Sequence, residues 1–281
     1  MAAATSDSVV LKHPSGACCE ITLFGAHLRS WKLADGSEQM FVSSKSSPAP
    51  KALRGGVPIC FPQFADRGPG GKHGFARTSA LWKVLSTASA PSPTVTLELR
   101  SDEATRAEFP GAYRLLYHVT LSADATIALA MQVVNEGEEA VVFTTALHTY
   151  FAVSDVTAAR IEGLKGTTYE DCAVPKGEEG KPPRMAEESE QLAIVGEVDR
   201  VYLATPSQLL LRDGAKTLAI NAQGFKDTVV WNIGAEKAGT LNDLGAGEWQ
   251  RYLCIESALI GRPIKLDAKC SWTAGVSYTV A

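Results

Sequence analysis

Two polar side chains stand inside apolar segments that otherwise have the composition of β-strands. His148 lies in TTALHTYFAV (residues 144–153), and Glu256 lies in RYLCIESALI (residues 251–260). Burying a glutamate costs several kcal/mol unless its carboxyl is paired or neutralised, so such a residue needs a reason. Taken singly, the histidine fits a hydrogen-bonded place in the core, and the glutamate fits a strand end facing water. On opposite sides of one pocket they would form an acid and a base that move two protons on one substrate.

A third candidate is Arg54, which stands beside two glycines in LRGGVPICFPQF (residues 53–64). Pro58 and Pro62 cannot donate to a strand ladder, and the glycine pair permits a positive φ or a close backbone approach, so the segment suits a loop. Such a loop would direct the arginine to a defined place. The guanidinium could meet an anion there, or it could bond carbonyl oxygens of its own turn.

Composition and motifs narrow the chemistry. The chain has 281 residues, 27 basic and 31 acidic, with a formal net charge of −4. Its lysines and arginines are scattered, which argues against non-specific binding of nucleic acid. The sequence contains no dinucleotide-binding glycine motif, phosphate loop, H-E-x-x-H or G-x-S-x-G. Its five histidines show no local ligand spacing, and we therefore expect no metal and no nucleic-acid partner.

The sequence predicts neither a membrane segment nor secretion. No apolar run approaches the ~20 residues that a spanning helix requires, and MAAATSDSVV lacks the basic start and apolar core of a secretory signal. The six cysteines form no C-x-x-C pair, which favours reduced thiols. We expect a cytosolic protein without membrane contact.

The elements that must position these residues are short strands separated by turn residues. Alternating and β-branched runs predict strands over residues 94–100, 114–121, 126–134, 141–147, 208–211, 217–221, 228–233, 251–255 and 271–280. One short helix is expected over residues 184–194, after the loop VPKGEEGKPP. Many closely spaced strands predict an antiparallel all-β sandwich or barrel. No linker or repeat divides the chain, so we expect one domain over residues 1–281.

Several longer motifs resemble those of a known family. The chain contains, in order, GAHLRSW (25–31), RGGVPICFPQF (54–64), KHGFAR (72–77), LHTYF (147–151), GEVDRVY (196–202), VVWN (229–232) and CIES (254–257). In these motifs it is similar to the aldose 1-epimerase superfamily, and within it to the hexose-6-phosphate mutarotases, or glucose-6-phosphate 1-epimerases. The motifs span nearly the whole chain. The resemblance implies an all-β, galactose-mutarotase-like supersandwich of antiparallel sheets.

The resemblance also implies a reaction and two catalytic residues. Mutarotation removes the proton of the C1 hydroxyl, protonates the ring oxygen to open the pyranose, and reverses both transfers after the aldehyde turns its other face. By resemblance Glu256 is the base at the C1 hydroxyl and His148 is the acid at the ring oxygen. No oxidation, phosphoryl transfer or covalent intermediate is needed, so no cofactor is implied.

Contacts to the phosphate follow from the phosphosugar branch. There Arg54 and Arg77 would face the 6-phosphate of a small-molecule phosphosugar, because a planar guanidinium can bond two phosphate oxygens at once. Lys72 stands where relatives often have glutamine. It could add a third cation to the phosphate site, or it could point to water.

Contacts to the sugar ring are implied for three further residues. His73 and Asp199 would contact sugar hydroxyls, and Gln63 is a weaker candidate in the same pocket wall. Asp199 could instead be a solvated turn acid beside Arg200.

Other functions stay open at this point. An aldose 1-epimerase acting on unphosphorylated sugars would keep the acid and base without needing two arginines. A non-catalytic carbohydrate-binding or sensing module is a second alternative, since this kind of sandwich recurs as an accessory domain. A glycosidase usually requires two carboxylates flanking the scissile bond, whereas the prominent pair here is a histidine and a glutamate. We expect the protein to act as a monomer.

Overall fold

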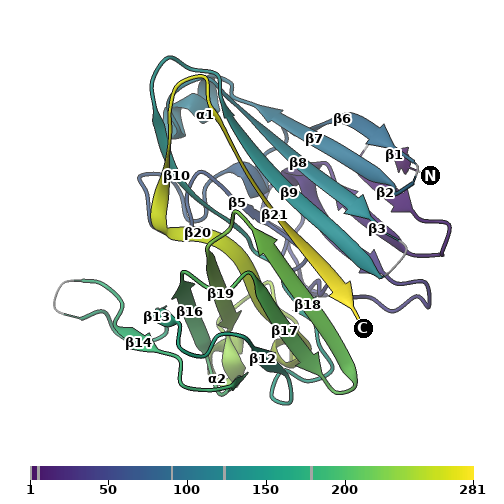
Figure 1. Ribbon diagram of the computed structural model, residues 1–281, viewed down its shortest axis with the longest axis vertical. Helices are drawn as coiled ribbons and strands as arrows, with labels where there is room; N and C mark the ends of the chain where they lie inside the picture. Colours follow the sequence, from purple (N-terminus) through teal and green to yellow (C-terminus); the bar gives the residue numbers. More distant parts are fainter. Residues whose placement is uncertain (1, 5–6, 90, 123–124, 178–179) are drawn as a thin grey trace.

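The computed structural model describes residues 2–4, 7–89, 91–122, 125–177 and 180–281, and its strands form three antiparallel sheets (Figure 1). The four-stranded sheet has the order β1 (Ala2–Ala4), β2 (Ser8–Lys12), β3 (Cys18–Thr22) and β4 (His27–Lys32). The eight-stranded sheet has the order β14 (Arg184–Ala186), β13 (Thr168–Asp171), β16 (Val198–Leu203), β19 (Asp227–Asn232), β20 (Tyr252–Leu266), β10 (Val141–Leu147) and β5 (Ile59–Cys60), with β11 (Tyr150–Ala152) also pairing with β20.

The nine-stranded sheet has the order β15 (Gln191–Ala193), β12 (Arg160–Glu162), β17 (Gln208–Asp213), β18 (Lys216–Gln223), β21 (Ser271–Val280), β9 (Thr126–Asn135), β8 (Tyr113–Leu121), β7 (Thr94–Arg100) and β6 (Lys83–Ala88). The helical segments are short, and they comprise α1 (Glu103–Glu108), α2 (Gly234–Ala238) and the 3₁₀ turns η1 (Phe24–Ala26), η2 (Ala76–Thr78) and η3 (Glu248–Arg251).

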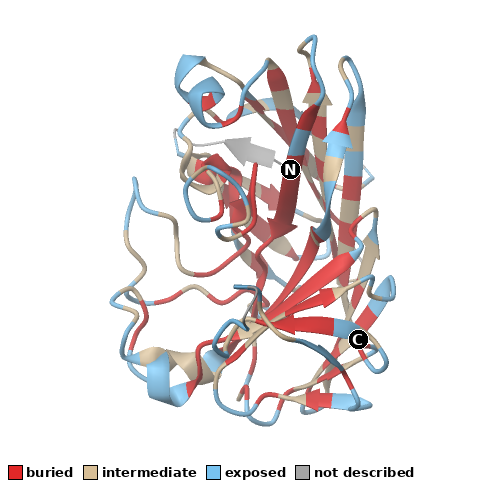
Figure 2. Ribbon diagram, turned by 90° about the vertical axis from the view of Figure 1, so that its left-hand side faces the viewer, coloured by how far each residue is buried: buried red, intermediate tan, exposed pale blue. Residues whose placement is uncertain are grey.

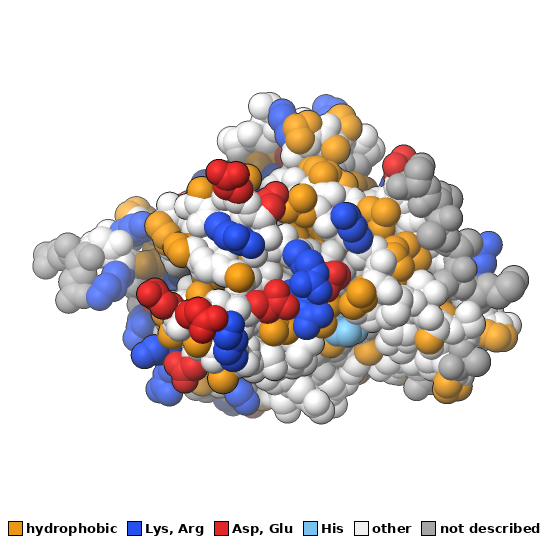
Figure 3. All heavy atoms as spheres, turned by 90° about the horizontal axis from the view of Figure 1, so that it is seen from above, with side chains coloured by type: hydrophobic (Ala, Val, Ile, Leu, Met, Phe, Trp, Pro, Cys, Tyr) orange, Lys and Arg blue, Asp and Glu red, His pale blue; other side chains and the backbone are white. Residues whose placement is uncertain are grey.

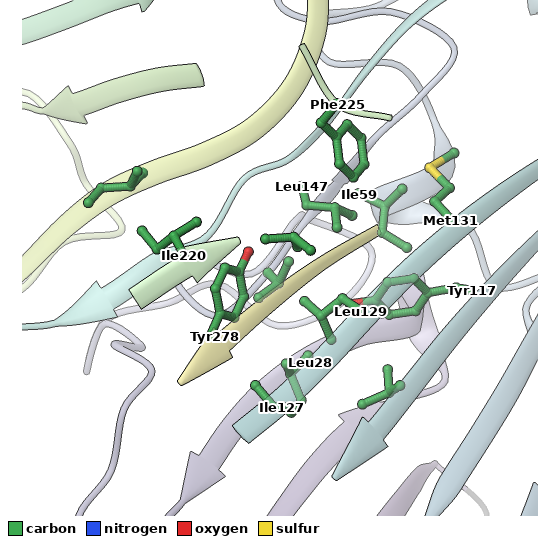
Figure 4. Close-up of a cluster of buried hydrophobic side chains, with 14 of the residues drawn as sticks. Leu28, Ile59, Tyr117, Ile127, Leu129, Met131, Leu147, Ile220, Phe225 and Tyr278 are labelled. Carbon is green, nitrogen blue, oxygen red and sulfur yellow. The ribbon is translucent and has the colours of Figure 1, made fainter. Parts of the chain in front are cut away.

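The sheets pack face to face around a large apolar core. In Figure 1 the four-stranded sheet lies behind β7, β8 and β9. Along β9 buried and half-buried residues alternate through the whole strand, as expected where one face of a sheet is covered. The close-up in Figure 4 shows side chains that come from several strands and meet in this core, among them Leu28, Ile59, Leu129 and Tyr278. In Figure 2 most of the buried residues lie on strands, and many of the exposed residues lie in loops.

Strand β20 is the structural centre of the second sheet. It pairs with β19 on one side and with β10 and β11 on the other, and the residues from Tyr252 to Ala258 are all buried. We expected this strand to end at residue 255, which would have left Glu256 at a strand end facing water. That interpretation is wrong, because the strand continues to Leu266 and Glu256 is 1% exposed.

Most predicted strands are confirmed, and the predicted all-β antiparallel fold class is confirmed as well. The strands over residues 94–100, 141–147 and 271–280 agree in both ends, and the others differ by a few residues apart from β20.

The helix expected over residues 184–194 is wrong. Its first part forms β14, which pairs with β13, and its last part forms β15, which pairs with β12. Between them Glu187 is buried, and its carboxylate accepts a 2.8 Å hydrogen bond from Tyr202. Strand pairing and this buried polar contact outweigh the helix propensity of MAEESEQL.

Two general properties bear on the environment of the protein. None of the helices in the described part of the chain has the length and apolarity that crossing a membrane needs. All six cysteines lie in the described part of the chain and are free thiols.

Candidate active site

A cavity of about 520 Å³ lies over strands β16, β19 and β20 and is bordered by loops from the first half of the chain and by the segment between α2 and η3. Its size suits a small-molecule ligand. Seven of the eight residues proposed from the sequence line it, namely Arg54, Lys72, His73, Arg77, His148, Asp199 and Glu256.

The strand register explains why residues distant in sequence meet here. Asp199 on β16 lies opposite Trp231 on β19, which lies opposite Cys254 on β20, so the three side chains share one face of the sheet. Glu256 is two residues beyond Cys254 and therefore points to the same face. In the neighbouring ladder Leu147 pairs with Ser257, so the chain leaves β10 with His148 beside Glu256.

His148 and Glu256 form a close buried pair. Nδ1 of His148 lies 3.2 Å from Oε1 of Glu256, and the two side chains are 10% and 1% exposed. The imidazole stacks on the ring of Tyr150 at a centroid distance of 4.8 Å, and Trp231 meets its edge at 6.0 Å. The stacked ring of Tyr150 covers one face of the imidazole and holds its orientation.

Burial sets the protonation of this pair. Desolvation raises the pKa of Glu256 well above its usual range, and the negative charge of Asp199 acts in the same direction. Desolvation also lowers the pKa of His148 well below its usual range, helped by the cationic Arg77 and Arg54. These shifts favour a protonated carboxyl beside a neutral imidazole, so the pair holds one transferable proton.

His73 presents a defined hydrogen-bond donor to the cavity. The backbone N–H of Ala65 donates to its Nδ1 at 3.2 Å, and the thiol of Cys60 lies 3.3 Å from the same nitrogen. Burial lowers the pKa of His73 to about 3, so the ring is neutral and its proton sits on Nε2. A neutral imidazole with Nε2–H can donate to a sugar hydroxyl.

Asp199 is a half-buried carboxylate on a strand rather than a solvated turn acid. Desolvation raises its pKa to about 6, although Lys72 opposes the shift. Because the carboxylate oxygens accept hydrogen bonds, this side chain can bind hydroxyl groups of a ligand above that pH.

The two glycines beside Arg54 have a steric purpose. Gly55 and Gly56 have φ values of +129° and +58°, and a Cβ on either would lie 2.3 Å from a backbone carbonyl oxygen. The loop that they form is tied to the catalytic segment, since the amide of His148 donates to the carbonyl of Pro58 and the amide of Tyr150 donates to that of Gly56. Side chains at positions 55 and 56 would push the loop away from His148 and Glu256.

Arg54 itself is already paired within the protein. Its guanidinium donates from Nε to Asp243 at 3.2 Å, lies 3.1 Å from the other carboxylate oxygen of that residue, and donates to the hydroxyl of Tyr150 at 3.1 Å. It also lies over the ring of Trp231, at 5.8 Å from the centroid. The guanidinium is therefore fixed in direction, and part of its charge is balanced by Asp243.

Arg77 has more unused hydrogen-bonding capacity. Its Nη2 donates to the carbonyl of Lys72 at 2.8 Å, whereas its buried Nε has no hydrogen-bond partner among the described residues. Gly74, between these two basic residues, has a φ of +66°, and a Cβ there would lie 2.1 Å from the carbonyl of Phe61. The tight turn brings Lys72 and Arg77 to one rim of the cavity.

Gln63 lies outside this cavity, although we expected it in the same wall. Its amide group donates to the carbonyls of Ala65 and Gly70 and accepts from the amide of Gly70 at 2.7 Å. It lines a separate cavity of about 480 Å³, which lacks the histidine and glutamate pair. Its hydrogen bonds instead hold the loop over residues 65–70 in shape.

Comparison with known proteins adds a family to this geometry. A family model described as aldose 1-epimerase matches residues 7–279. The chain belongs to the aldose 1-epimerase family. A relative from Cenchrus ciliaris, provisionally named a glucose-6-phosphate 1-epimerase, is 35% identical over 97% of this chain and 84% of its own length. A relative of the same provisional name from Escherichia coli is 30% identical over 90% of this chain and 83% of its own length.

Two solved structures share the fold. A protein from Salmonella typhimurium, provisionally named a mutarotase, superposes with a TM-score of 0.86 at 25% identity and covers 100% of this chain and 92% of its own. A galactose 1-epimerase from Lactobacillus acidophilus superposes with a TM-score of 0.74 at 15% identity, covering 100% and 97%. The galactose-mutarotase-like supersandwich expected from the sequence is thereby confirmed.

Several residues that line the cavity of this aldose 1-epimerase family member were missed from the sequence. Tyr150 and Trp231 lie within the motifs LHTYF and VVWN, but nothing in those motifs showed that their rings would frame His148. Asp243 lies in the segment between α2 and η3, and Arg67 pairs with Glu170 of β13 at 2.5 Å. Only the fold brings these two segments to the cavity.

Charges elsewhere on the surface are mixed. On the face seen in Figure 3, acidic and basic side chains are interspersed, and no stripe of a single sign crosses it.

Within the described part of the chain, His148, Cys254 and Glu256 form the group of three side chains whose donor atoms lie close enough together to hold a metal ion.

Proposed function

We propose that this chain interconverts the α and β anomers of a hexose 6-phosphate, with glucose 6-phosphate as the substrate of choice. The observation that carries the proposal is the His148 and Glu256 pair, with 3.2 Å between Nδ1 and Oε1, in a cavity that Lys72 and Arg77 border. The C1 hydroxyl and the ring oxygen of a pyranose are bonded to the same carbon. An acid and a base that are themselves close neighbours can therefore serve both oxygens.

The reaction leaves the charge of the pair unchanged. Once the single proton of the pair has passed from Glu256 to His148, the Glu256 carboxylate takes the proton of the C1 hydroxyl while the bond from C1 to the ring oxygen breaks and that oxygen takes the imidazolium proton. The C1 aldehyde then rotates about the bond to C2. The freed hydroxyl attacks the other face, returns its proton to His148, and Glu256 reprotonates the C1 oxygen. One proton is held by the pair before and after each ring opening and closure.

Recognition of the substrate would divide between two ends of the cavity. Lys72 and Arg77, with the fixed guanidinium of Arg54, would bind the 6-phosphate by charge-assisted hydrogen bonds. His73 would donate to a sugar hydroxyl, and Asp199 would accept from one. The provisional names of the two sequence relatives agree with this substrate.

Both catalytic groups come from one chain, which supports action as a monomer. All the proposed steps are proton transfers between side chains and substrate, so we propose that no cofactor takes part. The free thiols favour the cytosol as the compartment.

Equilibration of a pure anomer tests the proposal. Freshly dissolved α-glucose 6-phosphate is followed by NMR with and without protein, at a temperature where the uncatalysed rate is slow. We expect catalysis that is proportional to protein concentration. If the sugar phosphate binds but equilibrates at the uncatalysed rate, the protein is a binding module and the proposal fails.

The same measurement with free galactose and free glucose tests the substrate class. A phosphosugar enzyme should have a higher kcat/KM for glucose 6-phosphate than for either free sugar. The reverse order would show an aldose 1-epimerase for unphosphorylated sugars.

A further inference from the structure

Beneath the cavity, the catalytic pair has a third neighbour that the proposed reaction does not use. Nδ1 or Nε2 of His148, Sγ of Cys254 and a carboxylate oxygen of Glu256 all lie within 4.8 Å of one another, and all three residues are buried. The position of the thiol follows from the fold, since Cys254 and Glu256 are two residues apart on β20 and point to the same face. Tyr150, opposite Cys254 in the β11 ladder, helps to cover it.

Two polar atoms of this group are buried without a hydrogen-bond partner among the described residues. They are Oε2 of Glu256 and Nδ1 of His148, whose 3.2 Å contact with Oε1 of Glu256 is an ion-pair contact and does not have hydrogen-bond geometry; the two residues are 1% and 8% exposed. Buried polar atoms are rarely left unpaired, because the loss of water is then not compensated. The group therefore has unused capacity to bind a ligand that accepts electron pairs from a nitrogen and an oxygen.

We propose that His148, Cys254 and Glu256 form a site for a thiophilic divalent cation, with Zn²⁺ as the best match, which inhibits the enzyme by occupying its acid and base. Nitrogen, sulfur and carboxylate oxygen are the ligands that Zn²⁺ takes in proteins, and three protein ligands commonly leave a fourth position open. That position would face the cavity, to which His148 and Glu256 contribute.

Charge and geometry both fit such an ion. A thiolate and a carboxylate together balance two positive charges, so the buried complex would be neutral. Nδ1 of His148 and Oε1 of Glu256 already lie 3.2 Å apart, close to the separation of two ligands in tetrahedral coordination at about 2.0–2.3 Å, so binding requires the thiol of Cys254 to move closer to them. Mg²⁺ and Ca²⁺ prefer sets of oxygen ligands and should bind poorly.

Binding at this site would stop proton transfer. The cation takes the electron pairs of the imidazole and the carboxylate, displacing the one proton that the pair holds, and Cys254 releases its thiol proton to solvent. Neither the base nor the acid can then exchange a proton with a sugar. The phosphate end of the cavity stays open, because none of the three ligands belongs to it.

Direct binding can be tested with Co²⁺ as a spectroscopic stand-in for Zn²⁺. We expect the wild-type protein to bind one Co²⁺ per chain, with a near-ultraviolet absorption band from thiolate to metal that Zn²⁺ abolishes. Cys254→Ala should lose this band, and so should Cys254→Ser, which preserves size better in case the alanine variant fails to fold. Cys172→Ala is the control, because Cys172 lines the cavity to which His148 and Glu256 contribute but lies outside the proposed set of metal ligands. It should keep the band.

Inhibition is the second arm of the test, and it alone rests on the proposed function. Zn²⁺ should inhibit wild type and Cys172→Ala reversibly, with recovery on adding a chelator, while Cys254→Ala keeps its basal rate and requires at least about 10-fold more Zn²⁺ for half inhibition. Mg²⁺ should have no effect. Lack of a thiolate band in the wild type, or an unchanged band in a folded Cys254 variant, overturns the site. A protein that binds Co²⁺ through Cys254 but has no mutarotase activity leaves the site standing and overturns the function.

Discussion

Nδ1 of His148 lies 3.2 Å from Oε1 of Glu256, at the point where β10 ends beside the middle of β20. Both groups are desolvated, and their pKa values move in opposite directions, up for the carboxyl and down for the imidazole. A raised pKa makes the ionised carboxylate a stronger base, and a lowered pKa makes the imidazolium a stronger acid. The same burial therefore improves both partners of the proposed proton exchange.

Removing either proton carrier should lower turnover without unfolding the protein. Glu256→Gln and His148→Asn are each expected to lower kcat for glucose 6-phosphate by roughly 10²- to 10⁴-fold, the usual scale of general acid and base catalysis. Substrate affinity should change less than kcat. Glu256→Gln should melt no lower than wild type, because it removes a buried carboxyl that resists ionisation. A folded variant with near-normal kcat would exclude that residue from the mechanism.

The sequence predicted these two residues better than it predicted their surroundings. An isolated histidine and glutamate in apolar strands are unusual enough to be noticed, because burying either group has a high energetic cost. The length of β20 was underestimated, since Glu256 interrupts the apolar run that marks the strand. The carboxyl of Glu256 is tolerated inside the strand because His148, at the end of the neighbouring strand β10, lies beside it. No pattern in the local sequence indicates that contact.

Residues that act through tertiary contacts could not be predicted. Asp243 became relevant only when the fold placed it against Arg54, and Gln63 left the expected wall because its amide fits the loop over residues 65–70. The segment over residues 184–194 has good local helix propensity and became two edge strands. In each case long-range pairing decided the outcome, and a single sequence does not display it.

The two arginines should contribute unequally to phosphate recognition. Arg77→Ala should lower kcat/KM for glucose 6-phosphate by roughly 10- to 100-fold, the value of one or two charge-assisted hydrogen bonds. Arg54→Ala should lower it less, because Asp243 already balances part of the Arg54 charge. Rates with free glucose should change little. The ratio of kcat/KM for glucose 6-phosphate to that for free glucose should therefore fall, and it should fall most in Arg77→Ala.

A distant arginine provides the control for that series. Arg212 pairs with Glu162 on the nine-stranded sheet, and Arg212→Ala should leave the ratio unchanged. Added salt should erode the wild-type preference for the phosphorylated sugar. Equal losses on both sugars in Arg77→Ala would mean that this arginine supports the pocket and does not read the phosphate.

Asp199 should reduce stability at neutral and alkaline pH. Its pKa is about 6 in the folded protein, against 3.8 for an exposed aspartate, chiefly because of desolvation. The folded state therefore binds this proton more tightly than the unfolded state, and its contribution is most favourable below pH 4 and is lost as the pH rises through 6. Asp199→Asn avoids the charge, so it should raise the melting temperature at pH 8 and much less at pH 4.

An aspartate held by hydrogen bonds should behave in the opposite way. Hydrogen bonds from Thr157 lower the pKa of Asp155, so its carboxylate is favoured by folding and Asp155→Asn should give no gain in melting temperature at pH 8. If Asp199→Asn changes the melting temperature equally at pH 4 and pH 8, folding does not raise the pKa of Asp199.

Phosphate should also help to protonate the catalytic histidine. After desolvation, nearby positive charges, including those of Arg77 and Arg54, hold the pKa of His148 down, and a bound dianion would balance them. Each unit by which the pKa then rises increases the imidazolium fraction about 10-fold above that pKa. Adding phosphite dianion to reactions with D-xylose, which lacks the phosphate-bearing carbon, should therefore increase its mutarotation rate by up to ~10-fold at constant ionic strength. Arg77→Ala should lose this activation. If phosphite leaves wild-type turnover of xylose unchanged while glucose 6-phosphate remains a good substrate, the phosphate contributes binding alone.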